Sequence, residues 1–220
     1  MNYFSILTHI LIYYICMNLK FKRILAIGAH PDDVEYSCLG FLMYQKENGA
    51  DVSVYVASNG SIGDKTSGPK RYDETRLAIG SAQFSLHQGQ YNNFDYTNIE
   101  NELRKIVLKK EIDCVLVHDP RDTHQEHRII YEITMSAIRR LNISVIRYRS
   151  VSSSIDYVGN CFILIDKFID KKFEILAFHK SQSDKPYMNK QSIKDFHNFY
   201  FPSSLQGIYY ESLYIEKLLS

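Results

Sequence analysis

Two short polar segments of this 220-residue chain carry the side chains that could do chemistry. The first, Ala29-His30-Pro31-Asp32-Asp33, places an imidazole and two adjacent carboxylates directly after an apolar run. The second extends from Asp119 to His127 and contains two histidines, His124 and His127. Imidazole nitrogens and carboxylate oxygens bind zinc, and a catalytic zinc takes three protein ligands and leaves a position for water. Together the segments predict a metal-dependent hydrolytic centre.

The spacing within each segment suggests how the roles are divided. His30 and Asp33 lie three residues apart across a strand-to-helix turn, so both side chains can face one point beyond the strand. The second segment must supply another ligand, and its two histidines share one face at the start of a helix. If His127 binds the metal, His124 lies about one turn away and is free to act on the substrate. Asp32 is likewise free to accept a proton from the attacking water.

Each segment alone also fits a plain structural role, the first as a solvated turn with an aspartate N-cap and the second as a pair of surface histidines. Both segments, however, follow apolar strands of an α/β pattern, at the strand ends where such folds build their sites. The pairing of the two segments therefore favours a functional site over two unrelated surface features.

The elements that position these segments alternate between short apolar runs and helical patterns, which is typical of a parallel sheet covered by helices. We expect strands at residues 23–29, 51–57, 112–118, 144–150 and 161–165. We expect helices at residues 37–47, 72–84, 99–110 and 167–179, and another opened by a capping box at 123–126. Residues 58–70 are expected to form a loop, 86–97 have no clear pattern, and 209–219 fit a strand or a helix. The absence of repeats and linkers indicates a single α/β domain.

These residues carry a resemblance to the PIG-L/LmbE-like family of metal-dependent N-deacetylases. The first segment matches the family's Ala-His-Pro-Asp-Asp signature, and residues 122–127 resemble its Asp-x-His-Pro-Asp-His motif. In the second motif Gln125 replaces proline and Glu126 replaces aspartate, which leaves the contacts of that carboxylate open. The similarity covers about residues 22–217 and includes Arg71-x-x-Glu74, Asp95, the stretch 172–182 and Tyr209-Tyr210-Glu211.

The resemblance implies a Rossmann-like, mostly parallel α/β sheet with helices on both faces, as a single domain over residues 21–220. It implies hydrolysis of an N-acetyl group on an amino sugar or an amino-sugar conjugate, which releases acetate and a free amine. The implied cofactor is Zn²⁺, with Fe²⁺ or another divalent metal as alternatives. The implied roles are metal binding by His30, Asp33 and His127, general base catalysis by Asp32, oxyanion stabilisation by a protonated His124, and substrate contact by Arg71 and Asp95.

Other functions fit parts of the pattern. The same fold could cleave another sugar-linked amide or a thiol-conjugate amide. His30, Asp32 and His127 formally match the ligand set of iron(II) oxygenases, but those enzymes usually have all-β folds. A non-catalytic nucleotide- or sugar-binding α/β module is a further alternative. The turn after the first strand lacks a G-x-G-x-x-G pattern, and its two carboxylates would repel a pyrophosphate.

The composition limits the partners and the location. A net charge of +1 gives no reason to expect nucleic acid or an anionic membrane as partner. We expect a small N-acetylated sugar or glycoconjugate as the partner, and a homo-oligomer is compatible with the sequence. The four cysteines form no C-x-x-C pair, which argues against a disulfide framework. Reduced thiols and a cytoplasmic location are therefore expected.

The first 20 residues form an apolar extension, and residues 1–16 contain no charged side chain. The extension lacks the basic start of a secretory signal and is shorter than the roughly 20 apolar residues of a membrane span. A non-native or disordered extension, an interfacial anchor and a targeting signal stay open as interpretations. Met17 offers an alternative start of translation.

Overall fold

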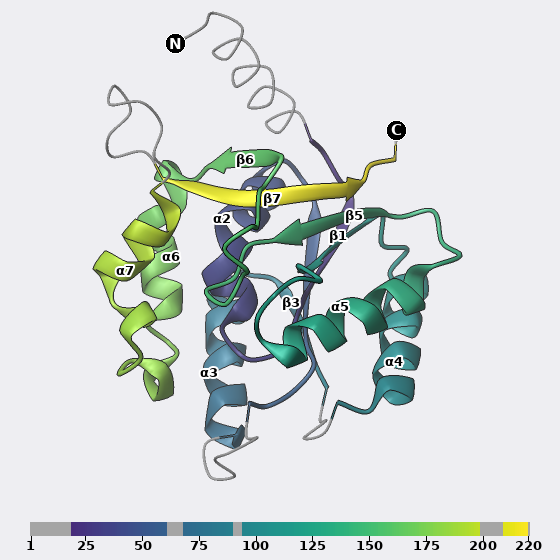
Figure 1. Ribbon diagram of the computed structural model, residues 1–220, viewed down its shortest axis with the longest axis horizontal. Coiled ribbons are helices and arrows are strands. Elements are labelled where there is room, and N and C mark those ends of the chain that lie inside the picture. The colour runs from purple at the N-terminus through teal and green to yellow at the C-terminus, as the bar shows by residue number, and fades with distance from the viewer. Residues whose placement is uncertain (1–18, 61–67, 90–93, 199–208, 220) are drawn as a thin grey trace, which may run out of the picture.

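The structure is a computed structural model that describes residues 19–60, 68–89, 94–198 and 209–219. The predictions for residues 1–16 lie outside the described residues. In the described part, a seven-stranded sheet is covered by helices on both faces (Figure 1). The prediction of a single α/β domain with a mostly parallel sheet is confirmed.

The sheet has the strand order β3-β2-β1-β4-β5-β7-β6. Strands β3, β2, β1, β4 and β5 are parallel, whereas β7 is antiparallel to both β5 and β6. Strands β2 and β3 follow β1 on one side of the sheet, and the next strand, β4, lies on the other side of β1. The strand order therefore reverses between β1 and β4. Sheets of this type bind ligands at the carboxyl ends of the two strands that flank such a switch point. The strands are β1 Arg23–Gly28, β2 Asp51–Val56, β3 Ser85–Gln88, β4 Cys114–His118, β5 Ser144–Tyr148, β6 Cys161–Leu164 and β7 Tyr210–Lys217.

Helices cover the sheet on both sides because neighbouring strand residues point to opposite faces. Ile24 and Ala26 of β1 pack into one apolar cluster, and Leu25 and Ile27 pack into another. The first cluster lies under α2 Asp33–Glu47, α3 Gly68–Ser81, α6 Ile169–Leu176 and α7 Lys190–His197. The second lies under α4 Tyr96–Lys109 and α5 Gln125–Ile138 (Figure 1). The 3-10 helices are η1 Asp166–Phe168, η2 Lys180–Gln182 and η3 Pro186–Met188.

Helix α2 begins four residues before the predicted start and bends near its first third. Cys38 has non-helical backbone angles, φ −138° and ψ 16°, which interrupt the helical hydrogen bonds. The backbone N–H groups of Gly40 and Phe41 instead donate to Glu211, at 2.8 and 2.7 Å. A carboxylate from β7 therefore replaces the missing helical acceptors at the bend.

Other boundaries also differ from the sequence prediction. Helix α3 begins at Gly68, within the predicted loop, and ends at Ser81. The uninterpreted stretch 86–97 contains most of β3 and the start of α4, and the ambiguous stretch 209–219 contains β7. The predicted helix at 167–179 is the 3-10 helix η1 followed by the shorter α6. Burial against the sheet, rather than local periodicity, sets these limits.

The cysteines do not all have the predicted state. Cys38 and Cys114 are free and buried, as expected. Cys161 is disulfide-bonded, so the expectation that all the thiols are reduced is wrong, and the cysteines no longer argue for a reducing compartment. Among the helices in the described ranges, none has the length and apolar character needed to cross a bilayer.

Candidate metal centre

The turn after β1 separates its two adjacent carboxylates. Asp32 has a left-handed backbone with φ +89°, a conformation that aspartate adopts more readily than most residues. As a result, Asp33 Oδ2 accepts the backbone N–H of His30 at 2.7 Å, whereas Asp32 Oδ2 lies 3.6 Å from Arg71 Nη2. The Asp32 carboxylate makes no side-chain cap bond, although the residue occupies the N-cap position of α2. The turn therefore does not use Asp32 as a plain helix cap.

The structure brings the three predicted metal ligands together. One donor atom from each of His30, Asp33 and His127 lies within 4.8 Å of the others. The two oxygens of Asp33 face different histidines, Oδ2 at 3.5 Å from His30 Nδ1 and Oδ1 at 3.4 Å from His127 Nε2. Two imidazoles and one carboxylate are a donor set that suits a catalytic zinc or a similar divalent ion. The residues present therefore fit a metal site.

The two adjacent carboxyl groups titrate in opposite directions. Burial opposes the ionisation of Asp33, but the nearby His127 and His118 hold its pKa well below the usual range. Burial raises the pKa of Asp32 to about 6, and the charge of Asp33 adds to this shift while His179 and Arg71 oppose it. Neighbouring carboxyl groups whose pKa values are driven apart commonly divide the acid and base roles of a site.

The Nδ1 atom of His127, on the side of the ring away from Asp33, contacts two polar side chains. Its Nδ1 lies 3.1 Å from Asp122 Oδ2 and 3.2 Å from the hydroxyl of Ser152. Asp122 also accepts a hydrogen bond from the hydroxyl of Ser150. Burial opposes protonation of His127, but the charges of Asp33 and Asp122 raise its pKa to about 10. The same contacts, against the effect of burial, lower the pKa of Asp122.

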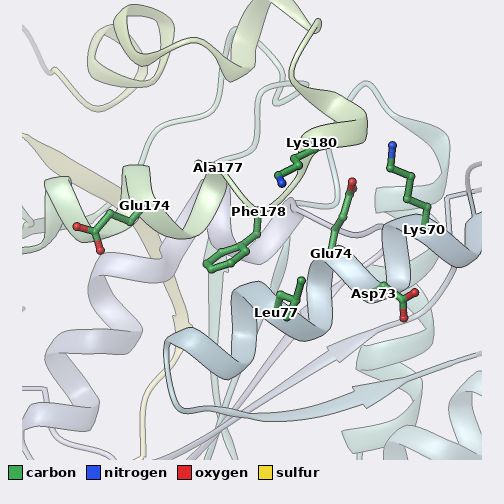
Figure 2. A pocket seen from close by; sticks show the side chains of 8 residues that line it. All are labelled: Lys70, Asp73, Glu74, Leu77, Glu174, Ala177, Phe178 and Lys180. Carbon is green, nitrogen blue, oxygen red and sulfur yellow. The ribbon is translucent and has the colours of Figure 1, made fainter.

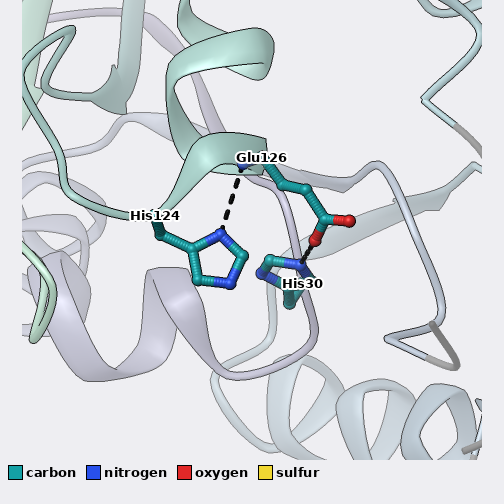
Figure 3. Close-up of side chains that lie close together, drawn as sticks. All are labelled: His30, His124 and Glu126. Atoms are coloured by element: carbon teal, nitrogen blue, oxygen red, sulfur yellow. Dashed lines mark hydrogen bonds and ion pairs between the residues drawn. The ribbon is translucent and has the colours of Figure 1, made fainter. Parts of the chain in front are cut away.

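Helix α5 begins one residue later than the predicted capping box implies. Its N-cap is His124, whose Nδ1 accepts the backbone N–H of Glu126 at 3.3 Å (Figure 3). Thr123 is not the cap, because its hydroxyl donates to the carbonyl of Ser152 at 2.7 Å. With Nδ1 as acceptor, a neutral His124 carries its proton on Nε2.

The surroundings of His124 favour its neutral form, whereas the family resemblance implies a protonated imidazole. Burial lowers its pKa, and the charges of His127 and His30 lower it further. The ring of His124 lies 4.9 Å from that of His30 and 4.5 Å from that of His127, between centroids. These shifts favour a neutral ring, which would offer an Nε2–H beside the three proposed ligands.

His118, the last residue of β4, is not among the residues predicted from the sequence. This histidine is fully buried, its Nε2 lies 3.1 Å from Asp33 Oδ2, and its ring stacks on His127 at 3.7 Å. Burial lowers the pKa of His118 to about 4, so the ring is neutral. Its place at the carboxyl end of the strand beside β1 was the available signal, since that edge also carries His30.

The two predicted substrate contacts have different settings. Arg71 donates to the carbonyls of Pro31 and Gly60, at 3.0 and 3.2 Å, and so joins α3 to the turn of the metal cluster. Asp95 is exposed and caps α4, where its carboxylate accepts the backbone N–H of Asn98 at 3.2 Å. The ring of Phe94, the preceding residue, lies 6.2 Å from that of His30. The structure therefore brings Arg71 to the cluster and leaves Asp95 at its periphery.

A separate hollow of about 410 Å³ lies between α3 and α6 (Figure 2). Its lining includes Leu77, Phe178 and Lys180, and none of the seven predicted site residues is part of it. The side chain of Glu74 at its wall accepts hydrogen bonds from the backbone N–H and the hydroxyl of Ser181. The candidate site therefore rests on the clustered donors at the switch point, and this hollow is a different feature.

The family model described as "PIG-L: GlcNAc-PI de-N-acetylase" matches residues 25–138, more than half of the chain. The chain belongs to the PIG-L family. The matched region includes most of β1 and all of β4 and α5, and so contains both segments of the cluster. Membership of this family of metal-dependent deacetylases makes the protein an enzyme of the amide hydrolase class.

Other proteins resemble this PIG-L member along most of their length. The uncharacterized deacetylase YaiS of Escherichia coli strain K12 is 27% identical over 176 residues, 74% of this chain and 92% of YaiS. N,N'-diacetylchitobiose deacetylase from Pyrococcus horikoshii has a TM-score of 0.74 at 18% identity, covering 98% of this chain and 93% of its own. GalB, the 4-carboxy-2-hydroxymuconate hydratase from Pseudomonas putida KT2440, has a TM-score of 0.74 at 14% identity. The match covers 90% of this chain and 98% of the GalB chain. Because a hydratase shares this fold, the fold alone does not specify the reaction.

Proposed function

We propose that this PIG-L protein is a zinc-dependent N-deacetylase that acts on an amino sugar or an amino-sugar conjugate and releases acetate and a free amine. The observation that carries the proposal is the arrangement at the first turn. His30, Asp33 and His127 place their donor atoms within 4.8 Å of one another, and Asp32 stands beside them with a separate carboxyl group. The resemblance to the deacetylase YaiS supports deacetylation, and the resemblance to the N,N'-diacetylchitobiose deacetylase supports an amino-sugar substrate.

The metal would be held by the two histidines and by Asp33. When bound, a divalent ion of this kind acidifies water and polarises the carbonyl of the substrate amide. Asp33 is suited to bind the metal because the surrounding histidines lower its pKa and keep its carboxyl group ionised. Its two oxygens face His30 and His127 separately, so the carboxylate fixes the relative position of the two rings.

Asp32 is the general base in this proposal. Its carboxylate takes the proton of the attacking water and then passes it to the nitrogen of the leaving amine. A carboxyl group whose pKa is raised to about 6 by burial is a stronger base than an ordinary aspartate and can still release its proton near neutral pH. Arg71 lies 3.6 Å from Asp32 and also holds the carbonyl of Pro31, so it fixes the turn that carries the base.

His124 stabilises the oxyanion that forms when water adds to the amide carbonyl. Its Nδ1 is occupied by the first turn of α5, which leaves the Nε2–H to donate toward the substrate. A neutral donor serves this role, since a fixed hydrogen bond is stronger to the developing anion than to the neutral carbonyl oxygen. Arg71 and Asp95 are retained as proposed substrate contacts.

The test is a screen for acetate release by zinc-loaded protein. The panel contains free N-acetylated amino sugars, their glycosides, nucleotide-linked forms and thiol conjugates, and Asp32→Asn is the matched control because it keeps the metal ligands. We expect zinc-dependent acetate release with at least one substrate and little with the variant. Wild-type protein that binds zinc but releases no acetate from any member would contradict the proposal. Hydration of an unsaturated carboxylic acid instead would place the chain with the hydratase.

A further inference from the structure

The two proposed ligand histidines present different ring nitrogens to Asp33. His127 turns Nε2 toward Asp33 and Nδ1 toward Asp122, at 3.4 and 3.1 Å. His30 is reversed, because its Nδ1 faces Asp33 at 3.5 Å and its Nε2 contacts the carboxylate of Glu126 (Figure 3). Each ring therefore has one nitrogen directed at Asp33 and the other directed at a carboxylate of the second segment.

This arrangement has a consequence for the tautomer of His30. A neutral imidazole that binds a metal through Nδ1 must carry its proton on Nε2, and a hydrogen-bond acceptor at Nε2 stabilises that form. Metal-binding histidines commonly donate this second N–H to a carboxylate, which fixes both tautomer and ring orientation. In the described part of the chain, Glu126 is the carboxylate that lies against Nε2.

We propose that Glu126 is a positioning residue for His30, which holds the proton on Nε2 and thereby presents Nδ1 to the metal. The inference rests on the proposed role of His30 as a ligand. It also assigns a contact to the position at which this chain departs from the aspartate of the PIG-L motif.

The length of the glutamate side chain is the basis of this assignment. The main chain of Glu126 is fixed at the start of α5, where its N–H donates to His124 Nδ1. From there the side chain must cross to the turn after β1. An aspartate would place its carboxylate about 1.5 Å nearer to the helix, the length of one carbon–carbon bond, and would withdraw it from His30. The extra methylene therefore allows a contact between α5 and the turn.

The surroundings favour a strong interaction. The side chains of His30 and Glu126 are 14% and 20% exposed, so the pair is largely removed from water. A hydrogen bond to an ionised acceptor is stronger than one between neutral groups, and limited exposure strengthens it further. Glu126 is also one of three donors, with His30 and His124, that lie within 4.8 Å of one another. Direct metal binding by Glu126 is thus the competing role, and the experiment must separate the two.

The first measurement is the zinc affinity of the full chain, by competition with a chelating indicator. Glu126→Ala and Glu126→Asp should both weaken zinc binding by about 10- to 100-fold, because neither side chain reaches His30. Glu126→Gln should weaken it less, since its amide oxygen can still accept the Nε2–H. Glu132→Ala, which removes an exposed carboxylate from the same helix, is the control and should bind zinc like wild type. Unchanged affinity in Glu126→Ala, or wild-type affinity in Glu126→Asp, would overturn the proposal.

The second measurement is a long-range proton–nitrogen NMR spectrum of zinc-loaded wild-type protein labelled with ¹⁵N-histidine. We expect the His30 signals of a metal-bound Nδ1 and a protonated Nε2. A metal-bound Nε2 would overturn the proposal and favour Glu126 as a ligand. This spectrum needs no variant, so it decides the matter even if the substitutions unfold the chain. Neither readout uses substrate, so a protein with these properties that releases no acetate would contradict the proposed function alone.

Discussion

Two buried charged clusters of this protein use their hydrogen-bonding capacity in opposite ways. In the first, Lys172 and Glu211 are both fully buried and lie 2.6 Å apart, and Glu211 also accepts the backbone N–H groups at the bend of α2. Both oxygens of that carboxylate have donors. At the metal centre, by contrast, Asp32 Oδ2 is buried and lies 3.6 Å from Arg71 Nη2, but it accepts no hydrogen bond from the described residues.

The contrast distinguishes a structural brace from a reactive site. A buried carboxylate with every oxygen occupied stabilises one conformation, whereas one with an unused oxygen keeps a strong preference for a proton or a ligand. The two clusters are joined by α2, which begins at Asp33 and is held at its bend by Glu211. The brace therefore helps to hold the helix whose first residue is the central ligand.

The largest effect should follow from Asp32→Asn. The variant cannot take a proton, so turnover should fall by about 10²- to 10⁴-fold, while the zinc content stays unchanged. The folded-state pKa of Asp32 is raised from 3.8 to about 6, so its ionisation costs stability increasingly between these two pH values and fully above pH 6, and the neutral amide removes this cost. The melting temperature near pH 7.5 should therefore not fall. A loss of both activity and thermal stability would indicate that Asp32 stabilises the fold, as Glu211 does, and is not only a reactive group.

Lys172→Met should lower the stability of the fold, which Asp32→Asn should leave unchanged. Removing the cation leaves Glu211 buried without its counter-ion, which should lower the free energy of unfolding by about 3–5 kcal/mol. Urea unfolding measures this loss. The double variant Lys172→Met/Glu211→Gln should recover part of it, since no charge is then left unpaired. Equal stability of wild type and the single variant would show that the pair does not brace α2.

His124→Ala should affect catalysis and leave metal binding intact. Loss of the Nε2–H donor should lower turnover by about 10²- to 10³-fold. Helix α5 also loses its N-cap, which should lower the free energy of unfolding by about 1 kcal/mol. Kinetics and zinc content on the same preparation test the assignment, and an unchanged rate would remove His124 from the reaction.

The smallest effect is a pH dependence of stability from His197, at the end of α7. Burial lowers its pKa well below 6.5, and the charge of Lys172 adds to this effect. Because the unfolded chain then binds a proton that the folded chain does not, stability should fall as the pH drops below about 6.5. The slope is at most about 1.4 kcal/mol per pH unit for one proton. The test measures the free energy of unfolding of wild type and His197→Gln between about pH 6.5 and pH 5. The slope against pH should be smaller in the variant, and identical slopes would contradict the role of His197.

The sequence predicts the composition of the metal cluster better than its internal contacts. Because the carboxyl ends of β1 and β4 meet at one edge, the strand pattern was enough to bring His30 and His127 together. It did not lead to His118, although this histidine ends the predicted strand at the same edge, because His118 belongs to the apolar run and not to the polar segment that follows it. The left-handed backbone of Asp32, which separates the two carboxylates, depends on packing of the whole turn.

For the fold, too, the sequence predicts the elements better than the long-range contacts that shape them. Short, mostly continuous apolar runs located most of the strands to within a few residues, since such runs indicate burial on both faces of the sheet. The bend of α2 could not be predicted, because the N–H groups freed there donate to Glu211, which is distant in sequence. The disulfide of Cys161 was likewise outside the reach of cysteine spacing.

The most direct test of the account compares the zinc content of Asp32→Asn with that of Asp33→Ala after purification and zinc loading. Asparagine is chosen at position 32 because it tolerates the left-handed backbone there. The account predicts about one zinc ion per chain in wild type and in Asp32→Asn, and almost none in Asp33→Ala. Zinc retained by Asp33→Ala, or lost from Asp32→Asn, would contradict the division of roles between these two adjacent carboxylates.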